Sequence, residues 1–288
     1  MINLSIPTDR DRLAEFIQDD INEFCSTFYE SGHRKHLGAS ELGEECWRKL
    51  WYGFRWTKLD VRDGRILRLF NVGHQAEPRF ISYLRGIGFE VREFEDEETK
   101  KQFRIVGAKG HYGGSLDGMC KAPIRYQLSE DIVLLNEFKT NNTGSGYTAI
   151  AEKELAKSKP KHWAQMCQYG AKKGLRYGLY MIENKNDSDI TIKIVELDWN
   201  YGKQLEKKAE QIIFAKEPPP KISENPAFFN CKFCHQAGIC HRGEQPEKNC
   251  RSCRQAVPVE DGQWNCTFHN SIIPDEWIKK GCDQWLPI

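Results

Sequence analysis

The sequence lacks long apolar runs, internal repeats and an excess of either charge. Its 288 residues contain 42 Lys and Arg against 41 Asp and Glu, a net charge of +1. No run approaches the roughly 20 apolar residues of a membrane helix. The opening residues, MINLSIPTDRDRLAEF, lack the basic stretch and apolar core of a secretory signal. We therefore expect no membrane association and a cytoplasmic location.

The near-neutral charge does not by itself indicate a nucleic-acid partner, but a local basic groove is compatible with it. Hydrophobic residues make up 39% of the chain and aromatic residues 11%, enough for a sizeable core. Apolar periodicity predicts helices at 8–30, 38–56, 63–86, 147–157, 161–173 and 200–215. Strand-like runs fall at 89–94, 102–107, 113–120, 131–140, 177–183 and 190–197. This order predicts an α/β fold with a central mixed sheet flanked by helices.

A proline-rich stretch, KEPPPKISENP at 216–226, separates this region from a segment with many cysteines and turns. We expect helices and a main core in 1–225, a cysteine segment in 226–245 and a small metal-binding tail in 246–288. Seven of the eleven cysteines lie in the last fifth of the sequence. Because a reducing cytosol disfavours structural disulfides, clustered cysteines there indicate metal binding.

The most apolar strand, 131–140, ends in an acid and a base. Glu137 and Lys139 are two residues apart, so they project from the same face of a strand. Alone, such a pair is most often a surface ion pair. Asp117, however, lies in the preceding strand-like run, and two carboxylates on adjacent strands would favour Mg²⁺ or Mn²⁺. Lys139 would then orient or deprotonate water, or stabilise developing negative charge.

Two helices add polar side chains to this set. His74 and Glu77 are three residues apart on the expected helix 63–86, and an imidazole there is a candidate third metal ligand. Gln165 and Tyr169 share a face of the helix expected at 161–173. The simpler interpretation of both pairs is packing, or the polar rim of an amphipathic helix.

In this order, a helix histidine, an Asp, E-x-K and Q-x-x-x-Y resemble the RecB-like branch of the PD-(D/E)XK nuclease superfamily. The chain has LD where that family has PD. The resemblance spans about residues 38–245 and implies a restriction-endonuclease-like core that hydrolyses DNA phosphodiesters, often as an exonuclease. It implies metal ligation by His74, Asp117, Glu137 and the Phe138 carbonyl, with Glu77 as a further ligand. It also implies that Gln165 and Tyr169 hold DNA near the metals. The pathway it implies is recombination, repair or phage DNA processing, with a recombination or replication protein as partner. If the chain is phage-encoded, its cytoplasmic location is the bacterial host cytosol.

The first cysteine group is Cys231-x2-Cys234-x5-Cys240, to which His235 or His241 would add a fourth zinc ligand. RecB-like nucleases with an iron–sulfur cluster, among them AddB-type subunits and CRISPR-associated adaptation nucleases, look similar. They have one cysteine before the core, here Cys46, and a C-x2-C-x5-C group after it. The resemblance therefore implies a 4Fe–4S cluster on these four cysteines, with zinc as the alternative.

The tail contains Cys250-x2-Cys253 and then Cys266, a pattern typical of structural zinc. The fourth ligand is open between Cys282, which we prefer because thiolates dominate structural zinc sites, and His269.

Basic and aromatic residues alternate in CWRKLWYGFRW at 46–56, where Arg48, Lys49 and Arg55 are candidates for binding DNA phosphates. The simpler interpretation places the aromatic residues in the core. The sequence as a whole predicts a Mg²⁺- or Mn²⁺-dependent deoxyribonuclease. A non-catalytic nucleic-acid-binding module and a thiol redox protein are the rival interpretations.

Overall fold

The computed structural model describes residues 4–30, 32–145 and 147–288. The helices are α1 (Pro7–Phe28), α2 (Trp47–Phe54), α3 (Gly64–Gly86), α4 (Tyr147–Glu152), α5 (Leu155–Ser158), α6 (Pro160–Lys173), α7 (Trp199–Ile213), α8 (Phe229–Lys232), α9 (Ala237–Arg242) and α10 (Asp275–Ile278). The strands are β1 (Leu37–Gly38), β2 (Glu90–Arg92), β3 (Phe94–Asp96), β4 (Lys101–Gln102), β5 (Arg104–Gly107), β6 (Tyr112–Ser115), β7 (Met119–Lys121), β8 (Leu134–Asn141), β9 (Tyr177–Asn184), β10 (Ile190–Glu196), β11 (Ala256–Pro258), β12 (Trp264–Cys266) and β13 (Ser271–Ile272).

The largest sheet among the described residues has five strands in the order β10-β9-β8-β7-β2. β8 and β9 run parallel, and the other neighbouring strands are antiparallel. β8 and β9 are buried along most of their length because helices cover both faces of the sheet. The expected α/β fold with a mixed sheet flanked by helices is confirmed.

The two faces of this sheet bury different helices. On one face, α3 packs Phe80 and Leu84 against Leu134 and Phe138 of β8. On the other face, α6 belongs to the main core cluster together with Leu135 of β8. Successive β8 side chains therefore alternate between the two faces. Glu137 and Lys139 lie on the α6 side.

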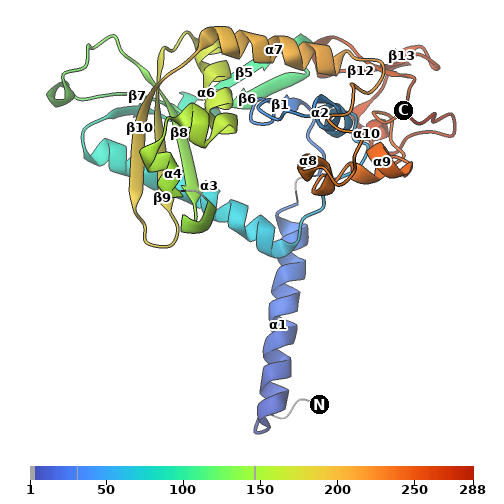
Figure 1. Cartoon of the computed structure of the whole chain (residues 1–288), viewed down its shortest axis with the longest axis horizontal. Coiled ribbons are helices and arrows are strands. Elements are labelled where there is room, and N and C mark those ends of the chain that lie inside the picture. The colour runs from blue at the N-terminus through green and yellow to red at the C-terminus, as the bar shows by residue number, and fades with distance from the viewer. Residues whose placement is uncertain (1–3, 31, 146) are drawn as a thin grey trace.

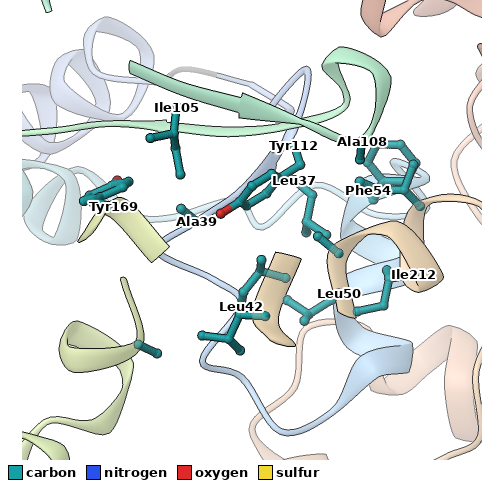
Figure 2. Close-up of a cluster of buried hydrophobic side chains, with 14 of the residues drawn as sticks. Leu37, Ala39, Leu42, Leu50, Phe54, Ile105, Ala108, Tyr112, Tyr169 and Ile212 are labelled. Atoms are coloured by element: carbon teal, nitrogen blue, oxygen red, sulfur yellow. The ribbon is translucent and has the colours of Figure 1, made fainter. Parts of the chain in front are cut away.

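A second sheet, in the order β1-β6-β5, extends the main core (Figure 2). Here two expectations are wrong. Leu37–Gly38 is a strand, β1, that pairs parallel with β6, and the Leu37 amide donates to the His111 carbonyl at 2.8 Å. The helix α2 begins only at Trp47. The strand expected at 113–120 is split into β6 and β7, with residues 116–118 between them. The split occurs because β6 and β7 pair in different sheets.

The cysteine-rich C-terminal elements gather at the side of the molecule away from β9 and β10 (Figure 1). Arg251 anchors them to the main core. It is fully buried among the rings of Phe54, Trp56 and Trp264, at 4.6, 4.4 and 4.7 Å, and it donates to the Lys35 carbonyl at 2.9 Å. The apolar residues of the tail belong to the same cluster as those of α2, so the tail shares the main core.

Helix α1 projects away from the rest of the molecule (Figure 1). Of its residues only Cys25 is buried, near the end that meets α3, where Arg68 donates to the Asn22 side chain at 2.7 Å. Phe16 and Phe24 remain about half exposed or more. Within the described ranges, no helix has both the length and the apolar composition of a membrane span.

Candidate active site and cysteine-lined cavities

Glu137 and Lys139 lie on β8, a central strand of the five-stranded sheet. β8 pairs with β9 along its whole length on one side, and on the other side its first two residues pair with β7. Glu137 is completely buried, whereas about a quarter of the Lys139 side chain is exposed. The Lys139 ammonium forms an ion pair with Glu137 Oε1 and donates to the Phe138 carbonyl at 3.1 Å. The acid and base on one strand face therefore meet inside the fold, not on its surface.

Asp117 lies in the break between β6 and β7, not inside a strand as expected. Its Oδ2 accepts a hydrogen bond from the Phe138 amide at 2.8 Å, just after the Asn136 amide donates to the Gly118 carbonyl. The Asp117 carboxylate thus supplies the next hydrogen-bond acceptor along β8, where main-chain pairing with β7 ends. Gly118 has φ +107°, and a Cβ there would lie 2.6 Å from the Arg92 carbonyl oxygen, so the turn that orients Asp117 requires glycine.

On α3, Glu77 is closer to this group than His74 is. Burial and the Asp117 charge raise the pKa of Glu77, although His74 opposes the shift. His74 Nδ1 lies 3.5 Å from Glu77 Oε1, and its side chain is 76% exposed. The structure therefore groups Glu77 with Asp117 and Glu137, while His74 lies at the outer edge of the group, next to Glu77.

The charges in this group shift one another. Burial raises the pKa of Glu137 to about 7, a shift that Lys139 opposes and Asp117 adds to. Burial would lower the pKa of Lys139, but the carboxylates of Glu137 and Asp117 outweigh it and raise that pKa. Glu137 Oε1 is ion-paired with Lys139, whereas Oε2 has no hydrogen-bond partner within the described part of the chain.

Gln165 and Tyr169 lie on α6 beneath this group. Gln165 Nε2 donates to Tyr169 Oη at 3.2 Å, and the two residues are 9% and 2% exposed. Burial, together with the Glu137 charge, raises the pKa of Tyr169. Their expected role as DNA-contacting groups does not agree with this burial. Here they pack behind the carboxylates.

Sequence reasoning missed two further neighbours of this group, His162 and Tyr180. His162 Nδ1 is 2.8 Å from Tyr180 Oη, and Tyr180 is the β9 partner of Glu137 in the parallel ladder. Burial and the nearby Lys139 charge lower the pKa of His162 to about 3, so it is neutral near pH 7. The signal in the sequence was the position of His162, three residues before Gln165 and on the same helix face.

A groove of about 1070 Å³ opens beside the carboxylate group, which comprises the side chains of Glu77, Asp117, Glu137 and Lys139. His74, Glu77 and Lys139 lie at one part of its wall, and Phe233 and His235 from the cysteine segment form another. Its basic lining residues include Arg34, Lys49, Lys58, Arg62, Lys161 and Lys185. Acidic residues line the groove as well, so its charge is mixed with a small basic excess; these are Glu30, Glu41, Glu44, Asp60 and Glu77.

The residues expected to hold DNA on helix 46–56 are only partly suited to that role. Arg55 is buried, and its guanidinium donates to the Ala256 and Cys253 carbonyls at 2.9 and 2.6 Å, so it cannot reach a phosphate. Arg48 donates to the Pro219 carbonyl at 2.5 Å. Lys49 does line the groove, where it pairs with Glu44.

Cys46, Cys231, Cys234 and Cys240 line one small cavity of about 20 Å³, although Cys46 lies far from the others in the sequence. Burial and the neighbouring Cys46 and Cys240 thiols raise the pKa of Cys231. The candidate histidines differ, because His241 lines this cavity and His235 lines the groove.

Cys250, Cys253, Cys266 and Cys282 line a second cavity of about 340 Å³, and His269 also lines it. Burial and the other three thiols raise the pKa of Cys250 to about 11. The Leu286 amide donates to Cys253 Sγ at 3.4 Å.

In residues 4–30, 32–145 and 147–288, no group of three or more His, Cys, Asp or Glu side chains is already arranged to hold a metal ion. The metals expected at the two cavities and at the carboxylate group therefore stay predictions.

No protein-family model and no curated protein matches the chain. Among solved structures, it is similar to SSO0001, with a TM-score of 0.45 and 16% identity over 76% of this chain and 94% of that one. It is also similar to LHK-Exo in complex with dAMP (TM-score 0.43, 18% identity, 62% and 86% covered). A third similar structure is the alkaline exonuclease LHK-Exo from Laribacter hongkongensis (TM-score 0.41, 18% identity, 62% and 87% covered). These similarities are weak, so the function of the chain has to be inferred from its own residues.

Proposed function

We propose that this chain is a metal-dependent DNA nuclease that hydrolyses phosphodiester bonds, most readily at DNA ends or in single strands. The observation that carries the proposal is Glu137. Its carboxylate is fully buried, Oε1 is ion-paired with Lys139, and among the described residues Oε2 has no hydrogen-bond partner, which is unfavourable unless another group binds it. Lys139 offsets part of this cost, and Asp117 and Glu77 add negative charge beside it.

The donor set fits Mg²⁺ or Mn²⁺, which prefer hard oxygen ligands. Asp117, Glu137 and the Phe138 carbonyl would hold the ion, with Glu77 as a further oxygen ligand. His74 would contribute from the groove edge only after its exposed ring turns inward. When bound, such an ion activates water and neutralises charge on a phosphate.

The protein groups have separable roles in this proposal. Lys139, held between Glu137 and the Phe138 carbonyl, would orient the attacking water and stabilise negative charge on the phosphate. Asp117 holds the middle of β8 through the Phe138 amide, and so also positions the Phe138 carbonyl. Tyr169, bonded to Gln165, lies close enough to Glu137 and Asp117 for their charges to add to burial in raising its pKa. The basic lining of the groove would hold the DNA backbone.

The experiment compares degradation of linear and single-stranded DNA with added Mg²⁺ or Mn²⁺ and with EDTA. Asp117→Ala and Lys139→Ala should each lower the rate by a factor of about 100 or more, the range for loss of one electrostatic group. Asp131→Ala and Lys121→Ala are matched controls, since both residues are exposed and neither lines the groove, and should cleave like the parent.

If Asp117→Ala and Lys139→Ala both digest DNA at the parent rate, the proposed site is wrong. If the parent binds DNA but degrades none under any metal condition, the non-catalytic binding module replaces the nuclease.

We further propose that both cysteine-lined cavities hold metal. The spacing of Cys46, Cys231, Cys234 and Cys240, which line one cavity, supports a 4Fe–4S cluster. Zinc, which four such ligands also suit, is the alternative there. For the tail, the thiols of Cys250, Cys253, Cys266 and Cys282 support structural zinc, with His269 as the alternative fourth ligand.

A further inference from the structure

Phe233 is an exposed aromatic residue inside the first cysteine group. It lies between Cys231 and Cys234, which both line the small cavity, while its own side chain is directed to the groove. The residue is 71% exposed, and its ring meets that of Phe229 edge-on at a centroid distance of 5.4 Å. A phenyl ring this exposed adds little to the core or to the covering of the thiols.

The segment that presents Phe233 is firmly anchored. Gln236, three residues later, is 1% exposed and accepts a hydrogen bond from Thr57 Oγ1 at 2.7 Å. Its amide nitrogen donates to the Lys58 carbonyl at 3.1 Å. Buried polar bonds to Thr57 and Lys58, just after α2, therefore anchor the segment that carries Phe233.

The surroundings of Phe233 point to a ligand that is both anionic and flat. Lys139 and Glu77 of the carboxylate group line the same groove, as do Lys49 and Lys58. Lys232 Nζ lies 5.4 Å from the centre of the Phe233 ring. Aromatic rings beside basic side chains bind single-stranded nucleic acids, because unpaired bases stack on the ring while the cations hold phosphates. A duplex offers such a ring no free base face except at its ends.

The ordinary interpretation is that Phe233 is one of the single apolar residues found on any protein surface. Phe229, which is 73% exposed but does not line the groove, is consistent with that interpretation. Phe233 differs because it shares the groove with the proposed catalytic group.

We propose that Phe233 is a base-stacking residue that makes the groove selective for unpaired nucleotides over paired ones. This inference rests on the proposed nuclease function for its biological meaning. The stacking itself can be measured without cleavage.

The test measures binding of a fluorescent 20-nucleotide single strand, and of a blunt duplex of the same sequence, in buffer without added divalent metal. Phe233→Ala should weaken single-strand binding by about tenfold, within the range for loss of one stacked base, and change duplex binding by less than twofold. Phe233→Trp should retain the parent affinity, and its indole fluorescence should fall when the single strand binds. Phe24→Ala, which removes a similarly exposed ring from α1 outside the groove, is the matched control.

The inference is overturned if Phe233→Ala binds the single strand like the parent, or if it weakens both DNA forms equally. The two proposals can fail separately. Loss of selective binding in Phe233→Ala without any metal-dependent cleavage by the parent would support the stacking site and reject the nuclease. Cleavage that depends on Asp117, with no effect of Phe233→Ala on binding or KM, would do the reverse.

Discussion

Single charged residues in this chain often join segments that are distant in sequence. Glu44, just before α2, is 9% exposed, and its Oε2 accepts hydrogen bonds from Lys49 at 2.7 Å and from Lys161 of α6 at 2.9 Å. Burial alone would raise the pKa of Glu44, but the two ammonium groups lower it to about 2. A carboxylate that is more acidic when folded stabilises the native state once it is ionised.

This pKa shift predicts how stability depends on pH. The contribution of Glu44 is fully present above its unfolded pKa of about 4.5 and is lost as the pH falls toward about 2. Glu44→Gln should therefore lower the free energy of unfolding at pH 7, and its deficit against the parent should shrink between pH 4.5 and 2. Urea unfolding across that range measures the deficit. The control is Glu196→Gln, which removes an exposed ion pair with Arg176 and should show almost no deficit. A Glu44→Gln deficit that stays constant with pH would contradict the assignment.

Arg251 is a second buried charged residue whose contacts join segments that are distant in sequence. Its guanidinium is surrounded by three rings and donates to main-chain carbonyls, so removing it leaves buried acceptors unpaired. Arg251→Ala should lower the free energy of unfolding by about 3 kcal/mol or more. Arg254→Ala, three residues away and exposed, should change it by less than about 0.5 kcal/mol. Thermal and urea unfolding of the two variants check this contrast, and equal stabilities would refute it.

Among the elements, the long periodic ones were predictable from the sequence and the short ones were not. The helix expected at 63–86 agrees with α3, and the strand expected at 177–183 agrees with β9. The helix expected at 38–56 is wrong over about its first half, since α2 begins at Trp47 and β1 pairs with β6, more than 70 residues later. A two-residue strand has no periodicity of its own, so only its partner defines it.

The junction of α1 and α3 gives a prediction with a control in the same helix. Gly64 begins α3 against the α1 backbone, and a Cβ there would lie 2.0 Å from the Asn22 carbonyl oxygen. Gly64→Ala should therefore push the helices apart and cost about 1–3 kcal/mol, with faster hydrogen exchange in α1. Gly86→Ala, at the other end of α3, meets no atom within 4 Å and should be neutral or stabilising by up to about 1 kcal/mol. Equal behaviour of the two variants would show that the close contact is not maintained.

At the scale of the whole molecule, one set of cysteines connects the C-terminal segment to the rest of the chain, and a second set lies within the tail. Cys46 precedes α2 and meets the 231–240 group, while the tail cysteines surround a second cavity beside the shared core. Metal bound at either place would contribute to folding as well as to local structure.

Metal analysis of protein purified without oxygen should find iron and zinc together. Cys234→Ser should lose the iron and keep the zinc, Cys266→Ser should lose the zinc and keep the iron, and both should unfold at lower temperature. Cys25→Ala, in α1 and remote from both cavities, should keep both metals. Two zinc ions and no iron in the parent would reject the cluster but keep the metal centres.

The sequence by itself determined the mixed α/β fold, the long helices and central strands, and the pairing of Glu137 with Lys139 on one strand face. Side-chain period and apolar runs are local properties, so they can be recognised without the fold. Only the tertiary structure decided that Glu77 lies nearer the carboxylates than His74, that Arg55 is buried, and that His162 and Tyr180 lie behind the group. It also brought Phe233 and Lys139 into one groove. Burial and proximity depend on which distant segments pack together, and no short stretch of sequence contains that information.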